Sequence, residues 1–356
     1  MRVGELLRYL VEVGASDLHL KVGRPPTVRV DGELLRSPFD TMTATDTEAA
    51  AFELLPGPKA EEFRETNEAD FGYTAEGMGR FRVNCFRQRG LVGVAIRRVR
   101  SDIPTFDELL LPPAAEALAS EHRGLVLITG PTGTGKTTTI AAMIGWINEH
   151  RAVHIVTIED PIEVVQGDIL SIIDQREIGL DTASYATALR HAVRQDPDVI
   201  FIGEIRDAET AEAAIQAAET GHLVISTMHT LDATETVNRM IDLFPPQQQR
   251  EVRVSLAASL KGVMCQRLVP RSDGKGRVPA VEVLINTGRV AERILDPEQT
   301  NTVIDVITEG EFYGMQTFDQ ALVALVRQGL ITPDDAADTA SSPHDFMLAL
   351  KAAQLA

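Results

Sequence analysis

Residues 130–137 read Gly-Pro-Thr-Gly-Thr-Gly-Lys-Thr and match the phosphate-binding pattern G-x-x-x-x-G-K-[ST] without a mismatch. Glycines let backbone N–H groups curl around phosphate oxygens, and a helix that follows directs its positive end at the anion. The pattern predicts a site for ATP with Mg²⁺, in which Lys136 reaches the β- and γ-phosphates and Thr137 places its hydroxyl on the metal. The residues expected to contact ATP here are Gly130, Pro131, Thr132, Gly133, Thr134, Gly135, Lys136, Thr137 and Thr138.

A glycine-rich turn that binds nothing is the alternative, and the flanking sequence argues against it. Residues 124–129 form a short apolar run typical of a buried strand, and residues 138–150 carry apolar positions at helical spacing. Further strands are predicted at 154–158, 199–203 and 223–227, separated by helical segments. This alternation indicates an α/β fold with a parallel sheet and helices on both faces.

Carboxylates and histidines follow these predicted strands. Hydrolysis of a phosphoanhydride needs one carboxylate to orient water and another near Mg²⁺. We assign Glu163, after the strand at 154–158, to the water and Glu204, after the strand at 199–203, to the metal, although the sequence alone does not separate the two roles. Asp160 is as readily a solvated strand-end acid. His222 and His229 flank the strand at 223–228.

The first hundred residues predict a separate, small α/β domain. A helix is expected near 3–11, a strand at 17–22, and a hairpin whose strands 27–30 and 33–36 are joined by Asp31 and Gly32. Strands are also expected at 79–86 and 90–99. In the first of these, Arg80 and Arg82 share the polar face, and the simplest interpretation of these arginines and of Arg97 is a solvated surface.

A proline-punctuated connector at 101–113 separates this block from the rest of the chain. We therefore predict a domain at 1–100, a linker at 101–113 and an ATPase domain at 114–356. Towards the C-terminus we expect one long amphipathic helix over 247–267, a strand at 278–285 and a helix near 318–328.

Composition restricts the class of protein. The 356 residues are 44% hydrophobic and 24% charged, with 34 basic and 52 acidic residues for a formal net charge of −18. Such a balance repels a phosphate backbone and disfavours a nucleic-acid substrate. No apolar run is long enough for a transmembrane segment, the N-terminus is not typical of a secretory signal, and two distant cysteines exclude a four-cysteine zinc module.

Three segments together resemble a known family. Residues 158–163, 196–207 and 220–230 look like the Asp box, Walker B segment and His box of the type II/IV secretion ATPase superfamily, the RecA-like motors of type IV pili and related secretion systems. The resemblance extends from residues 14–20 to 314–318. Residues 80–84 and 217–222 are similar to the retraction type of motor (the PilT type) in particular, and the long N-terminal extension and four-cysteine insertion of assembly ATPases are not found in this chain.

The resemblance implies a PAS-like N-terminal domain followed by a RecA-like ATPase domain, and a homo-hexameric cytoplasmic ring recruited to the inner membrane by a pilus platform protein. It implies that His222 and His229 sense the γ-phosphate and that Arg80, Arg82 and Arg97 reach ATP as arginine fingers. Hydrolysis would then be coupled to domain rotation that powers pilus retraction. Arg190 and Arg194 resemble family arginines but are equally suited to structural ion pairs.

Several alternatives stay open at this point. Residues 287–295 correspond to a motif of retraction motors, but their arginines are at positions 289 and 293. An accessory retraction paralogue and a pilus-assembly or secretion ATPase therefore remain alternatives. A nucleotide-gated scaffold without useful turnover is a candidate of another class. The net charge disfavours a nucleic-acid translocase, and no separate arginine-rich lid follows the loop, as a small-molecule kinase would require.

Overall fold

The computed structural model describes residues 2–30, 32–99 and 103–355. The chain divides into two compact units. The first comprises Met1–Asp102 together with Glu159–Val165 and Gln175–Ala183, and the second comprises Ile103–Ile158, Gln166–Asp174 and Ser184–Ala356. Two short segments from the middle of the sequence therefore group with the N-terminal residues, and the linker residues Ser101 and Asp102 lie outside the described residues.

The first unit is built on a six-stranded antiparallel sheet with strand order β3-β2-β1-β6-β5-β4. Its elements are α1 (Val3–Glu12), β1 (Asp17–Leu20), β2 (Thr27–Val30), β3 (Glu33–Arg36), α2 (Ala44–Leu54), α3 (Gly57–Thr66), β4 (Glu68–Ala75), β5 (Gly79–Gln88) and β6 (Leu91–Arg98). The three helices and the sheet enclose one apolar core, to which α1 contributes Val3, Leu6, Leu7 and Leu10. This is the predicted PAS-like α/β domain.

Local sequence signals explain much of this unit. β2 and β3 form the expected hairpin, and Gly32 has the positive φ of +87° that a tight turn requires, while Asp31 lies outside the described residues. Along β5, Phe81, Val83 and Cys85 are fully buried and the arginines between them are only partly so. The predicted alternation is therefore confirmed, and it leaves Arg80 and Arg82 on the face away from the core.

The second unit is built on a seven-stranded sheet with strand order β13-β12-β7-β11-β10-β8-β9. Its strands are β7 (Gly124–Thr129), β8 (His154–Glu159), β9 (Ile172–Glu177), β10 (Val199–Ile202), β11 (Leu223–Met228), β12 (Leu260–Pro270) and β13 (Arg277–Ile285), of which β8 and β9 end in segments that group with the first unit. Strands β12, β7, β11, β10 and β8 run parallel, and β13 is antiparallel to β12.

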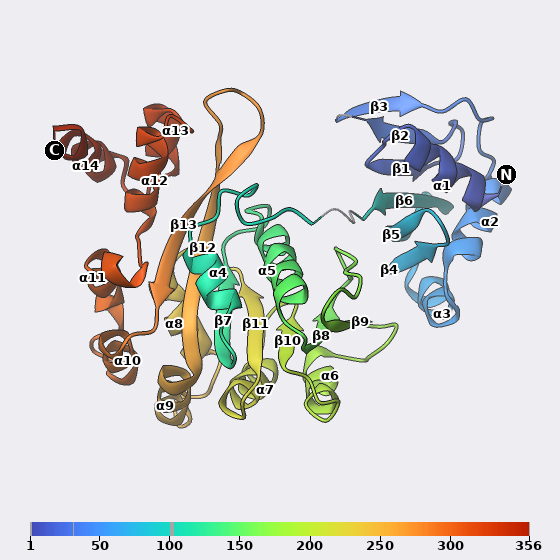
Figure 1. Cartoon of the computed structure of the whole chain (residues 1–356). Helices are drawn as coiled ribbons and strands as arrows, with labels where there is room; N and C mark the ends of the chain where they lie inside the picture. The colour runs from blue at the N-terminus through green and yellow to red at the C-terminus, as the bar shows by residue number, and fades with distance from the viewer. Residues whose placement is uncertain (1, 31, 100–102, 356) are drawn as a thin grey trace. The chain divides into compact units, whose positions relative to one another are not determined.

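Helices cover both faces of this sheet, as expected for a RecA-like domain (Figure 1). α4 and α5 form an apolar cluster with the sheet face that presents Val126 and Ile128. α7, which contacts β7 and β11, and α8, which contacts β12, do not belong to this cluster. The helices are α4 (Ala114–Ala119), α5 (Lys136–His150), α6 (Tyr185–Ala192), α7 (Ala208–Glu219), α8 (Ala233–Asp242), α9 (Gln249–Ser259), α10 (Gly288–Leu295), α11 (Val303–Thr308), α12 (Phe318–Arg327), α13 (Pro333–Thr339) and α14 (Pro343–Leu355).

The predicted long helix over 247–267 is wrong in its second half. α9 ends at Ser259, and β12 begins at Leu260 and inserts between β7 and β13. Residues 260–266 are buried apart from Lys261, so the strand shows no alternation of apolar and polar residues. A strand covered on both faces cannot be distinguished from a buried helix by periodicity alone. The strand predicted at 278–285 and the helix near 318–328 are confirmed as β13 and α12.

Candidate active site

The loop between β7 and α5 has the geometry of a phosphate cradle. Gly130, Gly133 and Gly135 all have positive φ, and Gly135 is the residue before the first turn of α5. A Cβ on Gly130 would lie 2.6 Å from the carbonyl oxygen of Gln266 on β12, so only glycine fits there. The fifteen-residue helix α5 therefore starts directly at the loop, with its N-terminal N–H groups available to an anion.

Lys136 lies against this loop. Its side chain is buried and its Nζ donates to the carbonyl oxygens of Gly130 at 2.7 Å and Pro131 at 3.0 Å. Thr137 is half-buried, and Thr138 is exposed. The next residue, Thr139, is held from behind because its hydroxyl accepts a hydrogen bond from Gln266 Nε2 at 2.8 Å. Lys136 is thus held by two carbonyl oxygens of the loop, and Gln266 on β12 supports the first turn of α5.

Glu204 and His229 lie at the same edge of the sheet as the loop. β7, β10 and β11 are parallel, and the register pairs Met228 with Thr129, so His229 and the loop follow equivalent positions on adjacent strands. His229 Nε2 lies 3.4 Å from Glu204 Oε2, and Arg206 pairs with the other carboxylate oxygen. Glu204 is largely buried, with 13% of its side chain exposed. The structure therefore brings these three predicted features together.

His222 is not part of this group. It precedes β11, whose six residues separate it from His229, which corresponds to about 20 Å along an extended strand. Its Nδ1 lies 2.9 Å from the carbonyl oxygen of Ala217, at the end of α7. β11 places the two histidines at opposite edges of the sheet, so His222 lies far from the phosphate loop of its own chain. The expected role of His222 in sensing the γ-phosphate stays a prediction.

Arg190 on α6 and Arg194 just after it lie on the surface. Arg190 forms an ion pair with Glu209 across exposed side chains, and Arg194 lies beyond the end of the helix and is exposed. The Arg190 contact matches the structural alternative. An exposed pair of this kind contributes only about 0–1 kcal/mol to stability.

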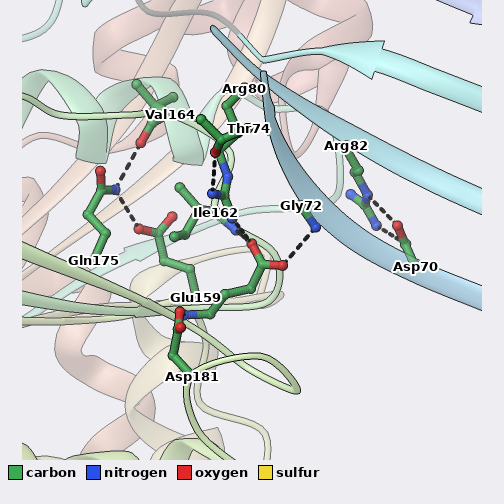
Figure 2. A network of polar contacts seen from close by, with 11 residues as sticks. Asp70, Gly72, Thr74, Arg80, Arg82, Glu159, Ile162, Val164, Gln175 and Asp181 are labelled. Atoms are coloured by element: carbon green, nitrogen blue, oxygen red, sulfur yellow. Dashed lines mark hydrogen bonds and ion pairs between the residues drawn. The ribbon is translucent and has the colours of Figure 1, made fainter. Parts of the chain in front are cut away.

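Glu163 belongs to the first unit. Its side chain is 47% exposed, and its Oε1 lies 3.9 Å from Arg82 Nη1. Arg82 donates two hydrogen bonds to Asp70, from Nη2 at 2.7 Å and from Nε at 3.3 Å (Figure 2). These bonds raise the pKa of Arg82 against the opposing effect of burial, with smaller contributions from the charges of Asp70 and Glu163.

The other two arginines have different partners. Arg80 pairs with Glu177 and donates to Thr74 Oγ1 at 3.2 Å. Arg97 is largely exposed and donates from Nε to Asp17 Oδ1 at 2.8 Å. Burial acts to raise the pKa of Asp17, but the hydrogen bonds from Arg97 and Ser16 more than offset it, so the net pKa is lowered. Each candidate arginine finger is thus matched with a different carboxylate.

A buried polar cluster lies behind the phosphate loop. Thr129, the last residue of β7, donates to Cys265 Sγ at 2.9 Å and lies 3.4 Å from the hydroxyl of Thr236 on α8. Glu282 on β13 accepts a 2.9 Å hydrogen bond from the backbone N–H of Ala233, the first residue of α8. Burial raises the pKa of Glu282 to about 7, and it also raises that of Cys265. Sequence reasoning missed this cluster because it took the region of Cys265 for a helix.

Sequence reasoning also missed Glu177. This buried residue ends β9 and binds Gly72 and Arg80, which lie 105 and 97 positions away in the sequence, as well as Ile162, which lies 15 positions away. No motif marks it, because an acidic residue at the end of a half-exposed strand is typical of solvent-facing sequence. The residues next to Glu177 in the sequence do not indicate which groups it binds.

The donor groups at the sheet edge fit Mg²⁺. This ion is held in nucleotide enzymes by one or two protein oxygens together with phosphates and water. The hydroxyl of Thr137 and the carboxylate of Glu204 are such oxygens, and within the described part of the chain no group of three His, Cys, Asp or Glu residues forms a protein-only metal site. Among the described helices, none combines the length and apolarity needed to cross a bilayer.

Known proteins have similar sequences and a similar fold. Residues 94–317 match the family described as Type II/IV secretion system protein. The chain is 42% identical to the type IV pilus ATPase PilU of Pseudomonas aeruginosa, over 99% of this chain and 92% of that protein. It is 40% identical to the type IV pilus retraction ATPase PilT of the same organism, over 97% and 100%. A crystal structure of the pilus retraction motor PilT with bound ADP is 44% identical and superposes with a TM-score of 0.88, covering 97% of this chain and 98% of that one.

These similarities extend over nearly the whole chain and include both units. The phosphate loop, Glu204 and His229 lie within the matched family region. The chain therefore belongs to the type II/IV secretion system protein family and is a P-loop ATPase with a PAS-like N-terminal domain and a RecA-like C-terminal domain.

Proposed function

We propose that this ATPase is a motor that powers retraction of type IV pili. One observation carries the proposal: a phosphate loop, Glu204 and His229 meet at one sheet edge in a chain that is similar to pilus ATPases along almost its full length. The proposed turnover rests on this buried carboxylate, which is held beside a histidine at the carboxyl end of the strands.

The roles of the residues at the sheet edge follow from their chemistry. The loop amides and Lys136 bind the phosphates, and Thr137 and Glu204 hold Mg²⁺, directly or through water. Bound Mg²⁺ supplies charge neutralisation on the phosphate oxygens. His229, beside Glu204, accepts or donates a hydrogen bond at the γ-phosphate and so reports its loss.

Glu163 orients the attacking water in this proposal. Its half-exposed carboxylate has a single cationic neighbour, Arg82, among the contacts of the described residues. Arg82 and Arg97 lie opposite each other on β5 and β6, and exposed arginines of this kind suit a finger that neutralises charge on the transferring phosphoryl group. The site is completed when the N-terminal domain of the same chain or of a neighbour closes on the nucleotide, which couples hydrolysis to domain rotation.

We further propose the domain division 1–100, 101–113 and 114–356, a homo-hexameric ring as the working assembly, and the cytoplasm as its location, with recruitment to the inner membrane. The platform protein at the base of a pilus is the proposed recipient of the force. The support is the similarity to the type IV pilus ATPases PilU and PilT.

A second candidate is an accessory retraction ATPase. The chain is 42% identical to PilU and 40% identical to PilT, so sequence identity favours neither relative. Arg289 on α10, in the segment that differs from the retraction motif, pairs with Glu309 on the surface. A strain that lacks the gene and is scored for twitching and for pilus length distinguishes the two: loss of retraction supports the primary motor, and retained but weakened retraction supports the accessory role.

The enzymatic part of the proposal is tested by phosphate release from Mg-ATP by the purified protein and by Glu204→Gln. We expect the wild type to turn over and the variant to lose about 10²–10³-fold in kcat. Equal and negligible rates in both would favour the nucleotide-gated scaffold. Stimulation of either by DNA would favour a translocase.

A further inference from the structure

Glu177 is an almost fully buried carboxylate, with 1% of its side chain exposed. Its Oε1 accepts a hydrogen bond from the backbone N–H of Gly72 on β4 at 2.7 Å, and its Oε2 accepts one from the backbone N–H of Ile162 at 3.1 Å. Arg80 on β5 completes the set through an ion pair. The contacts made by Gly72 and Arg80 can be followed in Figure 2. Both oxygens of one buried carboxylate therefore hold segments that are far apart in the sequence.

The identity of residue 72 follows from this contact. A Cβ on Gly72 would lie 2.2 Å from Arg80 Nη2 and 2.6 Å from Glu177 Oε2. Residue 72 has no positive φ, so a side chain here would not strain the backbone but would displace the ion pair of Arg80 and Glu177. The pair of Glu177 and Arg80 is packed against the backbone of β4.

The same strand end holds both neighbours of Glu163. Glu177 binds the N–H of Ile162, and Gln175, two residues earlier on the same face of β9, donates from Nε2 to the carbonyl oxygen of Val164 at 2.9 Å. Gln175 also donates to Glu159 at 3.0 Å. The chain is thus held at the N–H of Ile162 and at the carbonyl oxygen of Val164, one residue before and one residue after Glu163, although the Glu163 side chain itself is 47% exposed.

Arg80 and Arg82 on β5 differ in the cost of separating each from its carboxylate partner. Removing the partner of a buried ion pair leaves an uncompensated buried charge and is strongly destabilising, whereas an exposed pair contributes little to stability. Glu177 is buried and Arg80 is 15% exposed, while Arg82 and its partner Asp70 are 40% and 41% exposed. Arg82 can leave its partner at little cost, and Arg80 cannot.

We propose that Glu177 is a positioning residue that, together with Gln175, fixes the backbone of Glu163, and that Arg80 serves as the counter-ion of Glu177 and does not reach the nucleotide. This inference rests on the proposed role of Glu163 in turnover. It removes one of the three candidate arginine fingers and gives β9 a part in catalysis.

Glu177→Gln is the first test, because a carboxamide can accept from only one of the two backbone N–H groups and directs its own NH₂ at the other. We expect kcat for ATP to fall about 10–100-fold, since a displacement near 1 Å is sufficient for such a loss, with the KM for ATP and the affinity for a fluorescent ADP analogue changed less than about threefold. Gly72→Ala should reproduce the effect without changing any charge. Gly4→Ala is its matched control, because a Cβ at Gly4 meets nothing within 4 Å.

A double variant separates positioning from general damage. If Glu177 acts through Glu163, then Glu163→Gln with Glu177→Gln is no slower than Glu163→Gln alone, because the effects of residues that act as a unit do not add. Multiplying losses would overturn the proposal. If Glu177→Gln fails to fold, Gln175→Ala gives the same comparison from the other side of Glu163.

Arg80 has its own control. Arg80→Lys keeps the charge beside Glu177 and should recover most of the kcat lost in Arg80→Ala, whereas a finger depends on guanidinium geometry and is not rescued by lysine. A full loss in Arg80→Lys would therefore overturn its assignment as counter-ion. An inactive wild type would refute the proposed function itself, while an active wild type with an active Glu177→Gln and an inactive Glu163→Gln would refute only this inference.

Discussion

The two regions proposed to contribute catalytic carboxylates are built in different ways. At the sheet edge of the second unit, the phosphate loop, Glu204 and His229 each follow a strand, and the parallel register places them together. In the first unit, Glu163 lies in a loop that is held by Glu177 and Gln175 at the end of β9, and Glu177 is in turn held by Gly72, 105 positions away in the sequence. The first arrangement is set by local motifs on adjacent strands, and the second depends on a buried carboxylate whose other partners are distant in the sequence.

This difference predicts that substitutions at the sheet edge reduce ATP binding or turnover but do not prevent folding. Lys136→Ala should abolish detectable ATP binding or turnover, because Lys136 is expected to carry the positive charge nearest the β- and γ-phosphates. The protein should still fold, with a melting temperature lowered by only a few degrees for the two lost hydrogen bonds to the loop, since the glycines and Gln266 keep the loop in shape. Lys275→Ala, at an exposed lysine, is the control. Loss of folding in Lys136→Ala would contradict the independence of the loop from its lysine.

The two carboxylates themselves give the sharpest test of the comparison. Glu204→Gln and Glu163→Gln should each lower kcat about 10²–10³-fold, but only Glu204→Gln should raise the Mg²⁺ concentration needed for half-maximal activity. Titrating Mg²⁺ at saturating ATP in both variants measures this, with Glu212→Gln as a surface control. A raised Mg²⁺ requirement in Glu163→Gln alone would exchange the two assignments.

The same contrast explains what could be derived from the sequence. The phosphate loop, the strands that precede it and follow it, and the hairpin at 27–36 were all marked by neighbouring residues, so their placement was predicted correctly. β12 was mistaken for helix because burial on both faces removes periodicity. Glu177 carried no signal at all, because its function depends on Gly72 and Arg80, about a hundred positions away, and only tertiary structure brings them together.

The buried cluster behind the phosphate loop predicts a pH dependence of stability. Burial raises the pKa of Glu282 from its ordinary value of 4.5 to about 7, with the nearby charge of Asp232 acting in the same direction and Ala233 N–H and Arg267 opposing it. The folded state then binds the proton more tightly than the unfolded chain, so the contribution of Glu282 to stability is fully present below about pH 4.5 and is lost as the pH rises through about 7. A shift of this size corresponds to roughly 3 kcal/mol.

Urea unfolding between pH 5 and pH 8 measures this effect as the difference between the wild type and Glu282→Gln, which cannot titrate. In the Gln variant, the free energy of unfolding should not show the decrease with rising pH that Glu282 causes in the wild type. The carboxyl groups that both proteins share contribute equally to both curves, so they do not affect the difference. Parallel curves for the two proteins would show that Glu282 titrates normally in the folded state.

The smallest effect distinguishes the two ends of β11. His222 contacts the carbonyl oxygen of Ala217 near the end of α7, whereas His229 contacts Glu204. His222→Ala should therefore lower the free energy of unfolding by about 1 kcal/mol, as expected for one lost hydrogen bond, and should leave the Mg²⁺ requirement unchanged. His229→Asn should leave stability nearly unchanged and lower kcat, because its partner is a proposed metal ligand. If instead His222→Ala altered the Mg²⁺ requirement while stability stayed constant, His222 would have to act on a nucleotide held by another copy of the chain, because about 20 Å of strand separates it from its own phosphate loop.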